Sequence, residues 1–190
     1  VAFGRSYEIL FVDDGSRDGS GEALRALAAN DPRVKLVFFR RNYGQTAAMQ
    51  AGLQHATGDV LVTLDGDLQN DPDDIPMMLK KLQDEEWDLV AGIRQKRQDG
   101  MLLRKIPSKI ANAMIRQSTK VRLHDYGCTL KVFDARIAKN LGLYGELHRF
   151  IPVLAALQGA RMTEVPVKHH ARIHGVSKYG IGRTSKVASD

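Results

Sequence analysis

Residues 60–69, VLVTLDGDLQ, are the stretch that decides the expected fold. Their first half is a short apolar run, which is typical of a buried strand, and this run ends directly in Asp65-Gly66-Asp67. Residues 7–14, YEILFVDD, show the same arrangement, because an apolar run again ends in two acids. In open α/β sheets, ligands bind beyond the carboxyl ends of the strands. The two acidic groups therefore indicate a ligand site at one end of a sheet.

The other segments alternate between strand-like and helix-like patterns. This alternation predicts an α/β fold with a mostly parallel central sheet and helices on both faces. No linker-like break interrupts the chain, so we expect one domain over residues 1–190. The expected strands are 7–14, 34–39, 60–64, 89–93, 125–133 and 162–169, and the expected helices are 22–30, 46–56, 72–85, 102–117 and 149–157.

The composition is that of a soluble globular domain. The chain has 190 residues, of which 43% are hydrophobic and 26% are charged, so it can bury a core. Its single cysteine, Cys128, excludes an intramolecular disulfide framework and a cysteine metal cluster. No apolar run approaches the ~20 residues that span a bilayer.

The positive charge is concentrated in one segment. The net charge is +6, and residues 94–122 hold nine Lys or Arg side chains but only one acid, Asp99. Within this segment, the predicted helix 102–117 has an apolar side and a basic side and is interrupted by Pro107. Such a segment suggests an anionic partner, which is a phosphate, a nucleic acid or an acidic membrane surface. The alternative is an ordinary solvated helix face.

The strand-end acids suggest a divalent cation. Asp65, Asp67 and Gln69 supply hard oxygen ligands, which suit Mg²⁺ or Mn²⁺. Other sites lack support. An EF-hand loop starting at Asp14 has Arg25 where a bidentate Glu is needed. A Walker loop, a G-x-G-x-x-G motif after a strand and a G-x-S-x-G elbow are all absent from the sequence.

Four motifs together carry a family resemblance. They are VDDGSRDGS at residues 12–20, the run that contains DGDLQNDP within residues 41–72, DYGCTLKVF at residues 125–133, and R-x-x-G-x-SKYG at residues 172–180. In combination these motifs resemble those of family 2 glycosyltransferases. More closely, they are similar to those of the polyprenyl-phosphate group, which uses dolichol or undecaprenyl phosphate. The resemblance covers nearly all of the chain.

The resemblance implies a GT-A fold and an inverting transfer of sugar from a nucleotide diphosphate sugar to a polyprenyl phosphate. A lipid phosphate oxygen is already anionic, so the reaction needs charge neutralisation and alignment more than a strong base. The implied catalytic residues are Asp67, Arg94, Arg104 and Asp125; the implied donor-binding residues are Asp14, Asp65, Arg172, Ser177 and Lys178; and the implied metal ligands are Asp65, Asp67 and Gln69.

The resemblance also gives the basic segment 94–122 a role. An acceptor with a long isoprenoid tail stays in the membrane, so we expect this segment to dock on the anionic cytoplasmic face of the cell membrane. Residues 148–152, HRFIP, together with the nearby DYGCTLKVF motif, favour a UDP-sugar over a GDP-sugar. The sequence leaves open whether the chain assembles with copies of itself. We expect it to be a catalytic domain truncated at both ends, without the family's first strand and C-terminal transmembrane helices.

Two alternatives are retained. The first is a family 2 transferase with a soluble or polysaccharide acceptor, which the late SKYG motif and the basic helix argue against. The second is a non-catalytic nucleic-acid-binding domain, suggested by the pI of about 9.5. That alternative leaves the acidic strand ends unexplained, and only 6% of the residues are aromatic and able to stack on bases. We therefore expect no nucleic-acid partner.

Overall fold

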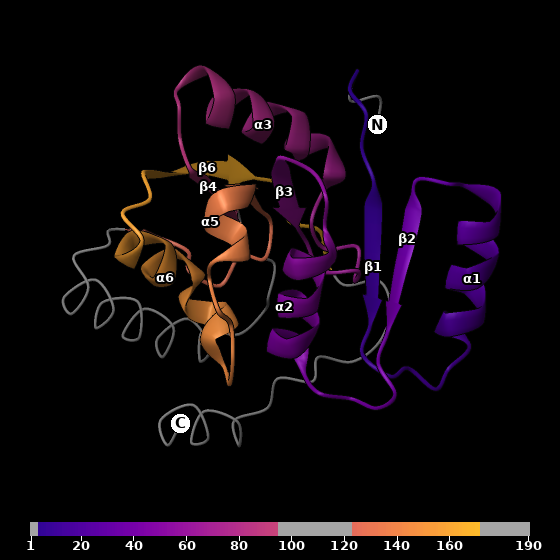
Figure 1. Ribbon diagram of the computed structural model, residues 1–190. Coiled ribbons are helices and arrows are strands. Elements are labelled where there is room, and N and C mark those ends of the chain that lie inside the picture. Colours follow the sequence, from indigo (N-terminus) through magenta and orange to yellow (C-terminus); the bar gives the residue numbers. More distant parts are fainter. Residues whose placement is uncertain (1–3, 95–122, 172–190) are drawn as a thin grey trace.

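The computed structural model describes residues 4–94 and 123–171 (Figure 1). The elements expected there from the sequence are present, most within a few residues of their predicted bounds; the predicted helix 102–117 lies outside the described residues. The strands are β1 (Ile9–Asp13), β2 (Val34–Phe38), β3 (Val60–Thr63), β4 (Leu89–Arg94), β5 (Lys131–Asp134) and β6 (Met162–Val167). The helices are α1 (Ser20–Asn30), α2 (Gln45–His55), α3 (Ile75–Asp84), α5 (Ala135–Lys139) and α6 (Ile151–Leu157), with 3₁₀ helices η1 (Pro72–Asp74) and η2 (Leu147–Phe150).

The largest boundary error concerns the strand predicted at residues 125–133. The ladder begins only at Lys131, and the preceding residues form a loop. In that loop the Asp125 carboxylate accepts a hydrogen bond from the backbone N–H of Gly127, at 3.2 Å. Such a local bond between a side chain and the backbone competes with the hydrogen bonds of a strand ladder. This competition explains why β5 begins later than predicted.

The described strands form two sheets rather than the single sheet that was expected. β1 and β2 pair in parallel, and the other four strands have the order β3-β5-β4-β6. In the larger sheet β4 and β6 are parallel, whereas β5 runs antiparallel to both of its neighbours, β3 and β4. Three of its strands therefore run in one direction, with β5 inserted between them in the opposite direction. The α/β class with helices on both faces is confirmed.

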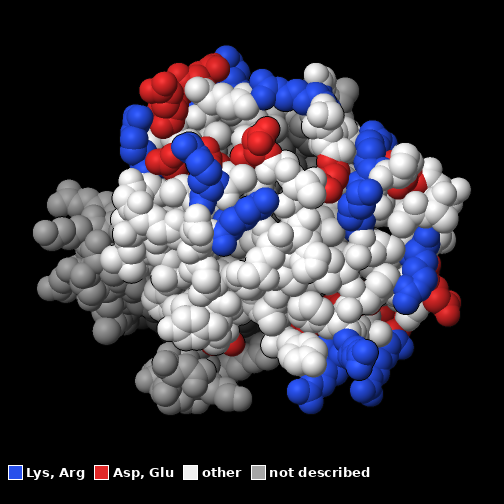
Figure 2. Space-filling model, in the orientation of Figure 1, with Lys and Arg blue, Asp and Glu red and all other residues white. Residues whose placement is uncertain are grey.

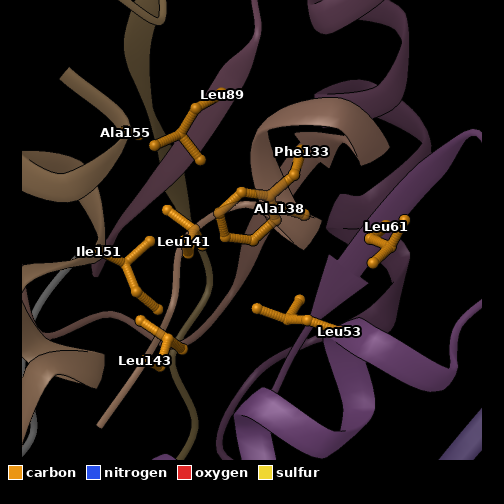
Figure 3. Packing of buried hydrophobic residues seen from close by; sticks show 9 residues of the cluster. All are labelled: Leu53, Leu61, Leu89, Phe133, Ala138, Leu141, Leu143, Ile151 and Ala155. Carbon is orange, nitrogen blue, oxygen red and sulfur yellow. The ribbon is translucent and has the colours of Figure 1, made fainter. Parts of the chain in front are cut away.

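Alternating side chains of the larger sheet build two core clusters. Leu89 and Phe133 face the layer of α2, α5 and α6, where Phe133 lies among Leu53, Leu61 and Ile151 (Figure 3). The residues next to them, Val90 and Val132, face the other way, toward Met78 and Leu82 of α3. This period of two is what a strand covered on both faces requires. Figure 1 shows the same arrangement, with α3 above the sheet and α5 and α6 below it.

The strand directions bring distant segments to one edge. Because β3, β4 and β6 are parallel, the residues that follow all three strands leave at the same edge of the sheet. The loop that precedes β5 enters at that edge as well, since β5 is antiparallel. At Gly92 these segments approach closely, because a Cβ there would lie 2.8 Å from Cγ2 of Val167 and 3.0 Å from Sγ of Cys128. Within the described residues, no helix has both the length and the apolar character needed to cross a membrane.

The core assignment predicts a large destabilisation for Phe133→Ala. Phe133 is fully buried, and removal of such a ring typically costs about 3–5 kcal/mol. The control is Leu157→Ala on α6, whose side chain is 80% exposed and whose loss we expect to cost less than about 0.5 kcal/mol. Denaturant unfolding followed by the fluorescence of Trp87 measures both variants. A cost below about 1 kcal/mol for Phe133→Ala would contradict the assigned core.

Candidate functional site

The Asp65-Gly66-Asp67 loop leaves β3 at the shared edge. Oδ1 of Asp65 accepts a hydrogen bond of 3.0 Å from Nε2 of Gln45, the first residue of α2. This bond ties the loop to the helix that follows β2. Burial, followed by the nearby charge of Asp67, raises the pKa of Asp65. Oδ1 of Asp67 accepts from the backbone N–H of Gln69 at 3.1 Å. Two carboxylates are thus held close together where proton or cation binding relieves their repulsion.

The residues present suit a divalent cation that is bound partly by the protein and partly by a substrate. The described residues contain no group of three or more His, Cys, Asp or Glu side chains that could hold a metal by themselves. Mg²⁺ is commonly held by one or two carboxylates together with substrate phosphates, so Asp65 and Asp67 fit that mode of binding. Gln69, the predicted third ligand, donates from Nε2 to the carbonyl oxygen of His170 at 3.3 Å. Its role as a metal ligand stays a prediction.

A second contact fixes the same loop to the end of β6. The backbone N–H of His170 donates to the Gln69 carbonyl at 2.8 Å, and Asn70 forms an isolated antiparallel bridge with His169. The Asp71 carboxylate lies 3.3 Å from Nζ of Lys168. It also lies 3.2 Å from Nε2 of His170. The pKa of Asp71 is lowered mainly by hydrogen bonds from the backbone of Asp73 and from His170. The chain that leads to residues 172–190 therefore leaves beside the Asp65-Gly66-Asp67 loop.

Arg94 and Asp125 form a bidentate ion pair at this edge. Nε of Arg94 lies 2.7 Å from Oδ2 of Asp125, and Nη2 lies 2.8 Å from Oδ1. Their side chains are only 14% and 12% exposed. Glu164 on β6 accepts a hydrogen bond from the backbone N–H of Asp125 at 3.1 Å, which ties the Asp125 loop to β6. The structure thus brings two predicted site residues together as one unit, although they are 31 positions apart in the sequence.

Lys131 lies between these two parts of the site, and the sequence analysis missed it. Its side chain is 2% exposed, and Nζ donates a hydrogen bond to the carbonyl oxygen of Cys128. Burial lowers the pKa of Lys131, while the carboxylates of Asp125 and Asp65 oppose that shift. The available signal was a lysine inside the apolar run of the DYGCTLKVF motif, where a lysine costs free energy unless its charge is compensated.

Asp14, predicted to bind the nucleotide, is anchored to the turn before α2. Its carboxylate accepts hydrogen bonds from the backbone N–H groups of Tyr43 and Gly44, at 2.6 and 2.9 Å, and from Nδ2 of Asn42, at 2.8 Å. The two turns touch at Gly15, where φ is +75° and a Cβ would lie 2.6 Å from the carbonyl carbon of Arg41. Asp14 therefore organises the entrance to α2, and its contact with a nucleotide stays a prediction.

A partly buried hydrogen bond connects α2 to η2. Oγ1 of Thr46 and Nδ1 of His148 are 2.6 Å apart, and they join α2 to η2. Burial, with a smaller effect of the Arg149 charge, lowers the pKa of His148 to about 4. His148 is therefore neutral at neutral pH. The sequence gives no sign of this contact, since the two residues are 102 positions apart.

A cavity of about 350 Å³ opens next to the Asp65-Gly66-Asp67 loop. Its walls combine apolar side chains from β1 and the loop, such as Phe11 and Leu68, with the polar groups of Asp65, Asn70 and His170. Leu68 adopts a left-handed backbone with φ of 63°, which is uncommon for a residue other than glycine. The site therefore offers a partly open cavity directly beside the Asp65-Gly66-Asp67 loop.

Four predicted site residues lie outside the described part of the chain, namely Arg104, Arg172, Ser177 and Lys178. The basic segment 94–122 is described only at Arg94. On the face shown in Figure 2, the described basic and acidic side chains are interspersed over the upper and right-hand parts of the surface.

Comparison with known proteins places this geometry in a family. The model of "Glycosyl transferase family 2" matches residues 3–142. The chain belongs to glycosyl transferase family 2. This family 2 domain is 49% identical over 193 residues to a dodecaprenyl-phosphate galacturonate synthase of Rhizobium johnstonii, a match that covers 100% of the chain and 57% of the relative. It is 44% identical over 182 residues to an undecaprenyl-phosphate 4-deoxy-4-formamido-L-arabinose transferase of Edwardsiella ictaluri, with 95% and 55% covered. The chain thus spans a little over half the length of these relatives.

Solved structures confirm the GT-A fold of the family 2 domain. A mannosyltransferase of Pyrobaculum calidifontis, solved with GDP-Man and Mn²⁺, gives a TM-score of 0.63 at 22% identity, covering 96% of this chain and 55% of that one. Glucosyl-3-phosphoglycerate synthase of Mycobacterium tuberculosis, solved with Mn²⁺ and UDP-glucose, gives 0.66 at 15% identity, covering 94% and 64%. At these identities the likeness shows the fold alone.

The lowered pKa of His148 predicts that acid destabilises the domain. The unfolded chain takes up a proton at this residue below its ordinary pKa of 6.5, whereas the folded state does so only near 4. The free energy of unfolding should therefore fall as the pH is lowered from about 6.5 to about 4. In His148→Asn, which keeps a hydrogen-bonding group toward Thr46, this part of the pH dependence should disappear. Denaturant unfolding at a series of pH values measures it, and identical pH profiles for the two proteins would contradict it.

Proposed function

We propose that this chain is the catalytic domain of an inverting glycosyltransferase that transfers a sugar from a nucleotide diphosphate sugar to a polyprenyl phosphate. The observation that carries the proposal is the 49% identity across the whole chain to a dodecaprenyl-phosphate galacturonate synthase. The relative with 44% identity also has a polyprenyl phosphate in its name, but a different sugar. The relatives thus share the acceptor and differ in the sugar, so the proposal commits to the acceptor class.

For the donor side, we propose Asp65 and Asp67 as ligands of a Mg²⁺ or Mn²⁺ ion, with Gln69 beside them. Such an ion neutralises the charge that builds up on a leaving diphosphate. The two neighbouring structures hold GDP-Man and UDP-glucose, and both contain Mn²⁺. They support a divalent cation and a nucleotide sugar, and our choice of UDP rests on the sequence motifs. Asp14 would contribute by positioning the turn at residues 42–44 next to the nucleotide.

For the acceptor side, we propose that the Arg94–Asp125 pair aligns the lipid phosphate. A guanidinium group binds phosphate oxygens through a planar set of donors. The bidentate bond to Asp125 holds that group in one orientation, which favours alignment of an attacking phosphate oxygen. Arg104, Arg172, Ser177 and Lys178 would add further donors from the segments outside the described residues.

The basic segment 94–122 supports a location at the membrane. An amphipathic basic helix suits an anionic lipid surface, and each Lys or Arg near such a surface contributes about 1 kcal/mol. We propose that the segment docks the catalytic domain on the cytoplasmic face of the cell membrane, where the polyprenyl phosphate is held.

A transfer assay with the full-length protein tests the proposed function. Radiolabelled UDP-sugars and GDP-sugars, including UDP-galacturonate, are incubated with undecaprenyl phosphate and Mn²⁺, and the lipid fraction is counted. We expect label to enter the lipid fraction with at least one UDP-sugar. Label that enters only a soluble saccharide or polysaccharide would contradict the proposed acceptor.

The metal assignment predicts that Asp67→Ala loses cation-dependent nucleotide binding. Removal of one of two carboxylates should weaken the binding of UDP with Mn²⁺ by at least about tenfold. The fold should remain intact, because two adjacent carboxylates repel each other without a cation. Asp73→Ala, which removes an exposed acid of η1, is the control. Titration calorimetry measures both. Equal UDP affinity with and without a chelator in the wild type would show that the cation assignment is wrong.

The basic segment predicts salt-sensitive binding to anionic vesicles. The attraction is mainly electrostatic, so binding should weaken sharply between low salt and ~0.5 M salt. Simultaneous neutralisation of Lys105, Lys109 and Arg116 should remove most of it. Co-sedimentation with anionic and neutral vesicles at two salt concentrations is the measurement. Equal binding to both kinds of vesicle would rule out this docking surface.

A further inference from the structure

Lys131 lies on β5, an inner strand of the larger sheet, at the end of that strand where the candidate site lies. It is the first residue of β5, and its register partners are Thr63 on β3 and Ala91 on β4. Its side chain is 2% exposed, and its ammonium group donates to the carbonyl oxygen of Cys128. Removal of an ammonium group from water costs several kcal/mol, and apolar residues of similar volume are often at least as stable in such positions. Stability of the core therefore does not explain why a lysine stands here.

The surroundings of Lys131 are the two parts of the candidate site. Asp65, at the end of β3, and Asp125, in the loop before β5, both attract its charge, and Arg94 opposes it. The other titratable groups near it are the buried thiol of Cys128 and the imidazole of His148. The carbonyl group that Lys131 holds belongs to the same loop as Asp125. Lys131 is thus linked to the acceptor side through this loop and to the donor side through the charge of Asp65.

The candidate site and its proposed substrates carry mostly negative charge. Arg94 compensates Asp125, but the carboxylates of Asp65 and Asp67 repel each other, and both proposed substrates are anions. A surface of carboxylates repels a diphosphate and a lipid phosphate unless positive charge lies close by. A buried cation is screened little by water and salt, so its effect reaches both Asp125 and Asp65.

We propose that Lys131 is a positioning residue that supplies this buried positive charge, orienting the Asp125 loop through the Cys128 carbonyl and favouring the approach of anionic substrates to the Asp65 side. The inference rests on the proposed function, because it takes the ligands of the site to be a divalent cation and phosphate-bearing substrates.

The test uses opposite effects on a cation and an anion. Lys131→Met keeps an unbranched apolar side chain and removes the charge, Lys131→Arg keeps the charge, and Lys139→Met on α5 is the exposed control.

The full chain is titrated with Mn²⁺ alone, by electron paramagnetic resonance, and with UDP in saturating Mn²⁺, by calorimetry. Lys131→Met should bind UDP at least about threefold more weakly, because an attractive unit charge has been removed from the site. It should bind Mn²⁺ alone at least as tightly as the wild type, since a repulsive charge has been removed.

Lys131→Arg should recover most of the UDP affinity. Lys131→Gln keeps a donor for the Cys128 carbonyl without the charge, and it replaces Lys131→Met in the same titrations if the methionine variant does not fold. A purely structural role predicts that both ligands bind more weakly, and that result, or unchanged binding of UDP, would overturn the inference. If the wild type binds neither Mn²⁺ nor UDP, the proposed function fails first and the inference fails with it.

Discussion

The insertion of β5 between β3 and β4 in the opposite direction is the constraint on which the site depends. Because β3, β4 and β6 are parallel, the segments that follow them leave at one edge of the sheet, and the loop before β5 enters at the same edge. The Asp65-Gly66-Asp67 loop, the Arg94–Asp125 pair and the Asp71 contact with β6 are all consequences of this arrangement. A parallel β5 would bring its loop to the other end of the sheet, away from Asp65 and Arg94.

Electrostatic compensation is the second theme of this edge. Three of the described acids are compensated by close partners: Asp125 is paired with Arg94, Asp71 with Lys168 and His170, and Asp14 with backbone donors. Asp65 differs from these three, because burial and the charge of Asp67 raise its pKa more than its hydrogen bonds lower it. A bound cation is stabilised most where negative charge is least compensated, which is at Asp65 and Asp67. For this reason we assign the metal to this pair at the strand end and not to the more numerous exposed acids.

The sequence predicted the local features of this protein better than the long-range ones. Apolar runs and helical periodicity predicted the described strands and most of the described helices, although not α5. Asp65 and Asp67 were predicted as site residues from a local signal, the acids at a strand end, whereas Arg94 and Asp125 were predicted from the family resemblance. The split of the sheet and the direction of β5 could not be predicted, since periodicity does not report which strands pair or which way they run. Contacts between residues far apart in the sequence, such as Thr46 with His148, left no local signal. Lys131 had one, an isolated charge within an apolar run.

The central claim is that Asp65 and Asp67 hold a divalent cation for a nucleotide diphosphate sugar. Anomalous diffraction at the manganese edge, from crystals of the chain soaked with Mn²⁺ and UDP, locates that ion directly. The account predicts one strong peak between the carboxylates of Asp65 and Asp67, with the UDP diphosphate as its remaining ligand. A manganese peak at Asp71 and His170 without one at Asp65, or bound UDP with no manganese beside it, would contradict the account.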